Sequence, residues 1–351
     1  MTEEEQVKEL RNACDNYSET LNALKALAHE FLWDDNRRAP VSNGVVSIGR
    51  RLDTSPDNRI CANNQVTPDL VVCTDDFAVL AEAKITLPRD AEMRWNQLAA
   101  IQKYDDDLKG WETKTEFVST HDIVLIVHYF RGNQIRQDLE DLSTAGRFHS
   151  SRKLGLISFA IIEQSQTWLS LELIYGSLTS REKEQKLRPL AIALDHIVAN
   201  PLFSHIELYD AMPPLPLLMN LVHKLIVRNL APEEFLSLRE NGEVRKEIRV
   251  PDLKSSLAET YGPGQSTQRV PEIPMTRWVR DALEMFAELG WAERHRSDVD
   301  AYVYVVKRRR NEFEQFLRHC AHRELDRKVP RPGSESQAVF PFMEEGSLTE
   351  S

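Results

Sequence analysis

Three charged side chains, Asp69, Glu82 and Lys84, have the types and spacing that chemistry on a phosphate group uses. They lie in the segment TPDLVVCTDDFAVLAEAK, residues 67–84, where two short apolar runs flank a pair of aspartates. Apolar, β-branched runs on either side of turn-forming residues predict a β-hairpin. Side chains two apart on a strand share a face, so Glu82 and Lys84 are expected to point the same way.

The register of this hairpin decides whether Asp69 joins them. If Asp75 and Asp76 form a two-residue loop, paired residues have numbers that sum to 151, and Asp69 faces Glu82. A symmetric four-residue loop keeps that pairing, whereas a three-residue loop places the two carboxylates on opposite faces of the sheet. In the first two cases three charges converge on one spot.

Two opposed carboxylates need a counter-charge. Directly opposed side chains have Cβ atoms roughly 4.5–5.5 Å apart, a distance at which like charges repel. A divalent cation, Mg²⁺ or Mn²⁺, would neutralise them, since magnesium prefers carboxylate oxygens and keeps waters that phosphate oxygens can replace. Lys84 would then hold the phosphate or orient the attacking water.

This arrangement resembles the PD-(D/E)xK phosphodiesterases, the restriction-endonuclease-like superfamily, with Pro68-Asp69 as the first element and Glu82-Ala83-Lys84 as the second. The resemblance implies that Asp69 and Glu82 bind the metal ion and that the backbone carbonyl of Ala83 adds a ligand. It also implies that Lys84 acts at the phosphate. An Asp followed at loose spacing by Glu-x-Lys also arises by chance, and an unrelated α/β domain is the alternative.

Two further residues are candidates for the same site. Members of the superfamily often carry one more acid on the first helix, and Glu30 is the best match. Some members place Gln and Tyr on the helix after the Glu-x-Lys strand; Gln97, Gln102 and Tyr104 occur here without the usual four-residue spacing. Tyr104 belongs to an apolar stripe and is expected in the core. Gln97 remains a candidate for a metal-bound water or a nucleotide, with a solvated side chain as the alternative.

The order of predicted elements indicates an α/β fold with an α+β mixed sheet, restriction-endonuclease-like, over residues 1–200. A first helix precedes the hairpin, and a helix over residues 90–108 follows it. A strand over Asp122–Phe130, a second hairpin over Leu154–Ser177 and a helix over Arg181–Ala199 complete the region.

The rest of the chain resembles a winged-helix-like, mainly α domain. Prolines punctuate a linker over residues 201–215, and the second domain is expected over residues 216–331. Thr276 is the expected N-cap of a helix that Gly290 ends, and the segments WAERHR and AYVYVV would form the wing. Residues 332–351 are acidic, rich in Ser, Glu and Gly, and predict a disordered tail.

Six arginines are candidates for nucleic-acid binding. In DNA-binding winged helices the helix before the wing enters the major groove, so Arg277 and Arg280 would reach toward DNA and Arg296 would lie at the wing. A basic segment, Lys307 to Arg331, contains the other three, Arg308, Arg309 and Arg310. It could follow a phosphate backbone, but a solvated helix face or a dock for an acidic partner would have the same composition.

Composition narrows the function classes. A net charge of −11 argues against indiscriminate binding to nucleic acid, which requires Lys and Arg to displace phosphate counterions. The four cysteines form no C-x-x-C pair, so neither a zinc finger nor a disulfide framework is indicated. No apolar run is long enough to cross a bilayer, and the acidic start MTEEEQVKEL differs from a secretory leader. A cytoplasmic protein is expected.

Together these features favour a Mg²⁺- or Mn²⁺-dependent deoxyribonuclease that hydrolyses phosphodiester bonds with a metal-activated water. One alternative is a non-catalytic nucleic-acid-binding or scaffold protein on a decayed nuclease fold. Another is a winged-helix regulator, which would leave Asp69, Glu82 and Lys84 without a purpose. DNA is the expected partner, and a protein partner or a homodimer is compatible with each alternative.

Overall fold

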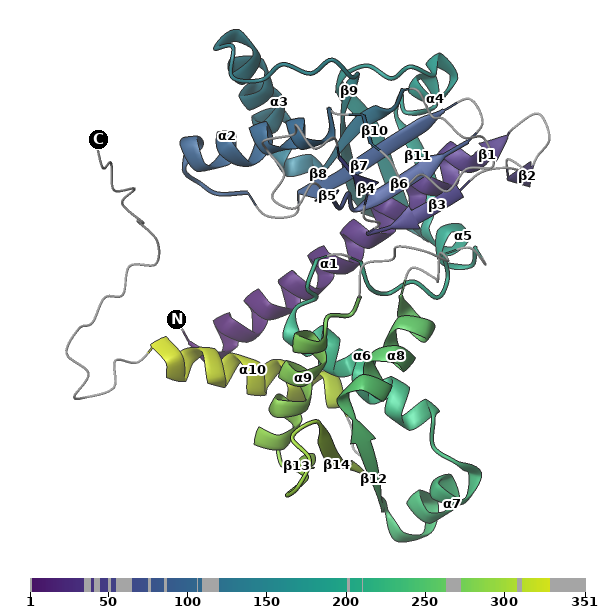
Figure 1. Cartoon of the computed structure of the whole chain (residues 1–351), viewed down its shortest axis with the longest axis vertical. Coiled ribbons are helices and arrows are strands. Elements are labelled where there is room, and N and C mark those ends of the chain that lie inside the picture. Colours follow the sequence, from purple (N-terminus) through teal and green to yellow (C-terminus); the bar gives the residue numbers. More distant parts are fainter. Residues whose placement is uncertain are drawn as a thin grey trace, which may run out of the picture.

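A long N-terminal helix, α1 (Glu3–Leu32), connects the two parts of the molecule in this computed structural model (Figure 1). Thr2 and Glu5 cap its start, because the Thr2 hydroxyl accepts from the Glu5 amide and the Glu5 carboxylate accepts from the Thr2 amide. The structure describes residues 2–34, 39–40, 45–49, 52–54, 65–74, 77–84, 87–105, 107–108, 120–200, 203–209, 211–262, 273–307 and 311–328.

The first part is built on a seven-stranded mixed sheet of order β11-β10-β9-β8-β7-β6-β3. Strands β7, β8 and β9 are parallel, and the other neighbours are antiparallel. The strands are β3 (Val45–Ile48), β6 (Leu70–Cys73), β7 (Ala78–Lys84), β8 (Asp122–His128), β9 (Leu154–Glu163), β10 (Thr167–Gly176) and β11 (Leu190–Ala193). Two short pairs, β1 (Trp33–Asp34) with β2 (Ala39–Pro40) and β4 (Leu52–Asp53) with β5 (Gln65–Val66), accompany the sheet. The expected α/β class with a mixed sheet is confirmed.

Helices cover both faces of this sheet (Figure 1). The second half of α1 packs on one face, where Leu24 and Leu27 join Val72 and Ala81 in a buried core. The other face is covered by α2 (Ala91–Ala99), the 3₁₀ helix η1 (Ala100–Tyr104) and α3 (Tyr129–Thr144). Because side chains alternate along β7, Leu80 and Glu82 face the layer of α2, η1 and α3.

The predicted first hairpin is confirmed, with the register that a two-residue turn implies. Leu70 pairs with Ala81 and Cys73 with Ala78. The Thr74 amide donates to the Phe77 carbonyl oxygen at 2.7 Å and closes the hairpin end. Asp75 and Asp76 themselves lie outside the described residues.

The predicted helix over Arg181–Ala199 is wrong. The segment forms α4 (Arg181–Lys186), then β11, which pairs with β10, and then α5 (Leu194–Val198). Pro189 explains the break, because proline has no amide hydrogen and its ring clashes with the preceding helical turn. The second hairpin, β9 with β10, is confirmed.

The second part combines helices with a three-stranded sheet of order β12-β14-β13. The first half of α1 also touches this part, since Leu10 packs on its core and Arg11 pairs with Glu314. Its elements are α6 (Leu215–Arg228), α7 (Pro232–Asn241), β12 (Glu243–Arg249), α8 (Val250–Tyr261), α9 (Thr276–Glu288), β13 (Ala292–Arg294), β14 (Ala301–Lys307) and α10 (Glu312–Lys328).

The ends of α9 differ in how well the sequence predicts them. Met275, not Thr276, is the N-cap residue, and no side chain there caps the helix, so the Thr276 prediction is wrong. Gly290 follows the helix with a φ of +68°, a conformation that favours glycine, and ends it as predicted. The strands β13 and β14 pair as the predicted wing. The predicted tail, residues 332–351, lies outside the described residues.

Candidate active site

The β6–β7 hairpin brings Asp69, Glu82 and Lys84 to one end of the sheet. Leu70 pairs with Ala81, so one further step of the same register sets Asp69 opposite Glu82. Both carboxylate side chains lie largely inside the protein, since each residue is 9 % exposed. Lys84 is the last residue of β7 and reaches the same spot.

The Asp69 side chain extends the hydrogen bonding between β6 and β7 by one step. The Ala83 amide donates to Asp69 Oδ2 at 2.7 Å, at the point where β6 no longer accompanies β7. In a strand, the amide and carbonyl of one residue point to the same edge. The carbonyl oxygen of Ala83 therefore faces the side on which Asp69 lies.

Glu82 is surrounded by three donors. Its Oε1 lies 2.9 Å from Lys84 Nζ and 3.6 Å from Lys103 Nζ. The Tyr104 hydroxyl donates to the other carboxylate oxygen and lies 3.1 Å from the Thr67 carbonyl oxygen. One carboxylate thus meets two ammonium groups, and with Asp69 opposite Glu82 the cluster holds two carboxylates and two ammonium groups.

These neighbours set the ionisation of Glu82. Burial of the carboxylate tends to raise its pKa, but Lys84, Lys103 and the Tyr104 hydroxyl together outweigh burial and hold the pKa below its ordinary value. Glu82 is consequently an anion at neutral pH, which is the form that a metal ion or an ammonium group binds.

Lys103 and Tyr104 also contact Glu82; the sequence predicted Tyr104 only in the core and did not identify Lys103. Tyr104 is buried, as its apolar stripe predicts, but its hydroxyl also reaches Glu82. The predicted uniform helix over residues 90–108 instead ends as the 3₁₀ turn η1. Lys103 lies in that turn, with its ammonium 4.6 Å from the centre of the Tyr104 ring. Only its position beside Tyr104 could have signalled it.

The donor set fits a hard divalent cation. Within the described residues, no three or more His, Cys, Asp or Glu side chains gather as a ligand set. The available ligands are two carboxylates and the Ala83 carbonyl, and Mg²⁺ and Mn²⁺ prefer such oxygen atoms. Because Lys84 and Lys103 share Oε1 of Glu82, coordination there requires Lys84 to turn to another anion, such as a phosphate.

The structure does not bring Glu30 or Gln97 to this site. Glu30 lies near the end of α1, on the sheet face opposite to Glu82, and its backbone carbonyl accepts from Lys183 Nζ at 3.0 Å. Its neighbour Phe31 packs against Phe77 at the turn of the hairpin, which is the far end of β7 from Lys84. Gln97 is exposed on α2.

Two of the predicted DNA-binding arginines lie on the outer face of α9 and are paired with acids. Arg277 lies 3.7 Å from Asp281, and Arg280 donates to Asp300 at 2.7 Å. Arg296 is exposed at the wing. The outer face of α9 therefore carries acids as well as bases.

Arg308, Arg309 and Arg310 lie outside the described residues. The helix that follows them, α10, uses charges of the basic segment for packing: Arg318 pairs with Glu314 at 3.3 Å, and Arg323 pairs with Glu288 on α9 at 3.2 Å. This part of the basic segment is thus partly a helix contact rather than an open phosphate-binding face.

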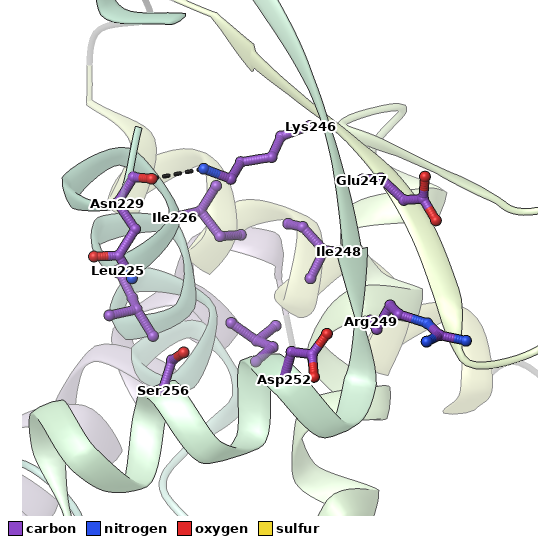
Figure 2. Close-up of a pocket in the computed structure, with 10 residues that line it drawn as sticks. Leu225, Ile226, Asn229, Lys246, Glu247, Ile248, Arg249, Asp252 and Ser256 are labelled. Carbon is purple, nitrogen blue, oxygen red and sulfur yellow. Dashed lines mark hydrogen bonds between the residues drawn. The ribbon is translucent and has the colours of Figure 1, made fainter. Parts of the chain in front are cut away.

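A cavity of about 280 Å³ lies elsewhere, between α6, β12 and α8 (Figure 2). Leu225 contributes to its apolar lining, and Lys246 points across it to donate to the Asn229 carbonyl oxygen at 2.6 Å. Arg249 at the rim pairs with Asp298 at 2.8 Å. Its cations are therefore already paired, and it contains none of the three predicted catalytic side chains.

Comparison with known protein families, with curated proteins and with solved structures found no match to this chain. None of the described helices combines the length and the apolar content that crossing a membrane requires. The functional conclusion therefore depends on the geometry of the site itself.

Proposed function

We propose that this protein is a metal-dependent nuclease that hydrolyses phosphodiester bonds, with DNA as the expected substrate. The observation that carries the proposal is the placement of Asp69, Glu82, Lys84 and the Ala83 carbonyl at one end of the β6–β7 hairpin. A purely structural strand pair has no need for two opposed carboxylates beside a lysine.

The order of elements supports the resemblance to the PD-(D/E)xK fold. Helix α1 precedes three antiparallel strands, β3, β6 and β7, and α2 then leads to β8, which is parallel to β7. In the second part, the order α6, β12, α8, α9, β13 and β14 with sheet order β12-β14-β13 supports the winged-helix resemblance.

Each residue of the site has a role in this proposal. Asp69, Glu82 and the Ala83 carbonyl would hold Mg²⁺ or Mn²⁺. When bound, that ion supplies an activated water and neutralises charge on phosphoryl oxygens. Lys84 would leave Glu82 to contact a non-bridging phosphate oxygen, where its ammonium stabilises the developing negative charge. Lys103 would keep Glu82 ionised and oriented while Lys84 is engaged.

The substrate assignment depends on the second part of the molecule. A winged helix that presents Arg277, Arg280 and Arg296 favours DNA. The acids paired with the first two arginines reduce the positive charge that this surface offers to DNA phosphates. With a net charge of −11, a protein partner or a second copy that delivers the substrate remains part of the proposal.

A second candidate function is a non-catalytic nucleic-acid-binding or scaffold role on a decayed nuclease fold. It is favoured by the neutralisation of Glu82, whose carboxylate is already contacted by Lys84, Lys103 and Tyr104. Under this alternative the cluster stabilises the sheet edge and binds no metal ion.

Cleavage assays separate the two candidates. Wild type, Lys84→Ala and the control Lys224→Ala, which changes an exposed lysine on α6, would be incubated with supercoiled, linear and single-stranded DNA. Each reaction would contain Mg²⁺, Mn²⁺ or EDTA. We expect metal-dependent cleavage by wild type and by Lys224→Ala and none by Lys84→Ala. Cleavage by all three proteins at one rate would contradict the assignment of Lys84.

A further inference from the structure

Three consecutive aromatic side chains, His128, Tyr129 and Phe130, gather where β8 ends and α3 begins. We call them the aromatic cluster. The His128 and Phe130 rings are stacked, with centroids 4.8 Å apart and planes at 19°, and the Tyr129 ring centroid lies 3.9 Å from that of Phe130. Phe159 on β9 packs edge-on against His128 at 5.2 Å and anchors the cluster to the sheet.

Two rings of the aromatic cluster are open to solvent. Phe130 is 74 % exposed and Tyr129 is 49 % exposed. Burying large apolar rings stabilises a fold, so rings left exposed side by side often mark an interaction site. Because His128 covers one side of Phe130, a flat partner would stack on the other.

The aromatic cluster lies at the same edge of the sheet as the candidate active site. Strands β7 and β8 are parallel, and Lys84 pairs with Val127. His128 is the next residue, so its Cα lies one strand spacing and one residue rise from that of Lys84, roughly 6 Å. Because side chains alternate along the strands, His128 points to the α1 face and Lys84 to the face that α2 and η1 cover. A strand of nucleic acid whose phosphate contacts Lys84 would reach the cluster by passing over this edge of the sheet.

The charges around the cluster are of both signs, and the exposed cation is the one that follows the rings in the sequence. Arg131, on the first turn of α3, is exposed; its guanidinium donates to Gln134 at 3.1 Å and forms no ion pair within the part of the chain that the structure describes. Glu19 approaches His128 to 3.9 Å from α1. Burial raises the pKa of Glu19, as do the nearby carboxylates of Asp15 and Glu163, and burial lowers the pKa of His128.

We propose that the aromatic cluster stacks on unpaired bases, so that the substrate is a single strand or a frayed end of nucleic acid. This inference rests on the proposed function, which places a phosphate at Lys84. Every base has an aromatic face, so stacking accepts any sequence. Bases inside a duplex keep these faces covered by their neighbours and cannot stack on Phe130 without leaving the helix.

A nucleic-acid strand fits this surface better than an apolar protein segment. The aromatic cluster is followed directly by Arg131 and lies at the same edge of the sheet as Lys84. Single-strand sites combine stacking rings with a positive path for the backbone. An apolar segment would leave the Arg131 guanidinium without a counter-charge, whereas a phosphate would supply one.

Binding without cleavage tests this inference. Labelled oligothymidylate, oligouridylate and a blunt DNA duplex would be titrated with the full chain in EDTA and followed by fluorescence anisotropy. The proteins would be wild type, Phe130→Ala, the double variant Tyr129→Ala/Phe130→Ala, and the control Phe235→Ala, whose ring is 56 % exposed on α7. We expect the double variant to bind single strands roughly 5- to 100-fold more weakly than wild type does. Duplex binding and the control should be unchanged.

Equal single-strand affinity of wild type and the double variant would overturn the inference, and so would an equal loss for single strands and duplex. Unfolding midpoints of all four proteins would show that each is folded. The thymidylate and uridylate arms distinguish DNA from RNA. Because EDTA removes the metal ion, the result is independent of catalysis. If wild type and Phe130→Ala cleave equally, the proposed nuclease activity stands and the stacking inference is wrong. If binding depends on Phe130 but no cleavage occurs, the stacking inference stands and the proposed nuclease activity is wrong.

Discussion

Two clusters of acids and bases lie in the layer that α2, η1 and α3 form over the sheet, and they are built differently. Arg94 on α2 and Asp138 on α3 form a closed pair, with a guanidinium nitrogen 2.9 Å from Asp138 Oδ1 and side chains only 8 % and 7 % exposed. Arg94 also donates to the Pro88 and Arg89 carbonyl oxygens, and the Trp95 ring donates to Asp138.

The Glu82 cluster has the opposite arrangement. One carboxylate meets the two lysines Lys84 and Lys103, whose side chains are 21 % and 27 % exposed, and a second carboxylate, Asp69, stands next to it. The Arg94–Asp138 pair leaves no charge to offer a ligand. Under the proposed function, the Glu82 cluster would exchange partners when a cation and a phosphate bind. The Arg94–Asp138 charges hold two helices together, whereas the charges around Glu82 would serve the proposed reaction.

Removing the Glu82 charge should have the largest effect on activity. Glu82→Gln keeps an acceptor for the Tyr104 hydroxyl but loses the anion that would hold the metal ion. We expect cleavage to fall at least about 100-fold, the size found when one group that stabilises transition-state charge is removed. Initial cleavage rates in Mg²⁺ measure this. If Glu82→Gln cleaves at the wild-type rate, the Glu82 cluster does not serve catalysis and does not differ in role from the Arg94–Asp138 pair.

Breaking the closed pair should affect stability instead. Asp138→Ala leaves the buried Arg94 guanidinium without its carboxylate, which costs about 3–5 kcal/mol of unfolding free energy. Urea denaturation measures this loss. Under conditions where the variant is folded, its cleavage rate should match that of wild type. Loss of cleavage from a stably folded Asp138→Ala protein would show that the pair also serves the site.

Lys103 should have an intermediate effect. Its ammonium lies farther from Glu82 than that of Lys84, so Lys103→Ala should lower kcat by roughly tenfold, less than removal of a direct phosphate contact. Its part-exposed ion pair should contribute less than about 1 kcal/mol to stability. Parallel kinetics and denaturation of this variant would check both values. A loss of more than about 1 kcal/mol in stability with an unchanged kcat would show that Lys103 stabilises the fold and does not serve the site.

The smallest expected effect is on stability at acidic pH, where Glu82 becomes protonated. The pKa of Glu82 is lowered from 4.5 because, although burial raises it, the two lysines and Tyr104 lower it more. The unfolded chain therefore binds this proton more tightly. The stabilisation is fully present above about pH 4.5 and is lost as the pH falls through the folded pKa. Glu82→Gln should lose less stability than wild type in that window. Equal acid dependence in urea denaturation would contradict the pKa shift.

The hairpin and its register were predictable because local rules decide them. Turn residues at Asp75-Asp76, strands on both sides and a side-chain period of two leave few pairings, and the structure has the predicted one. Lys103 was not predictable in the same way. A uniform helix over residues 90–108 gives no reason to place its side chain at Glu82, and the change to a 3₁₀ turn at Ala100 depends on packing.

Strand β12 was not predicted from the sequence, and Glu30 was assigned to a site at which it does not lie, because both placements depend on contacts between residues far apart in the sequence. Strand β12, with the sequence EVRKEIR, has few apolar residues and forms because it pairs with the apolar β14. Glu30 was chosen from the amphipathic pattern of the first helix, which cannot show which face of the sheet that helix covers. Tertiary packing decides both cases.

A titration of Mn²⁺ into the purified protein tests the central claim most directly, because it asks whether the Glu82 cluster exchanges its lysines for a metal ion. Calorimetry would compare wild type with Asp69→Asn and Glu82→Gln. The control is Glu140→Gln, which changes a half-buried acid on α3 that pairs with Arg136. We expect wild type and the control to bind Mn²⁺ and the two site variants to lose that binding. Absence of binding by wild type, or identical binding by all four proteins, would contradict the account.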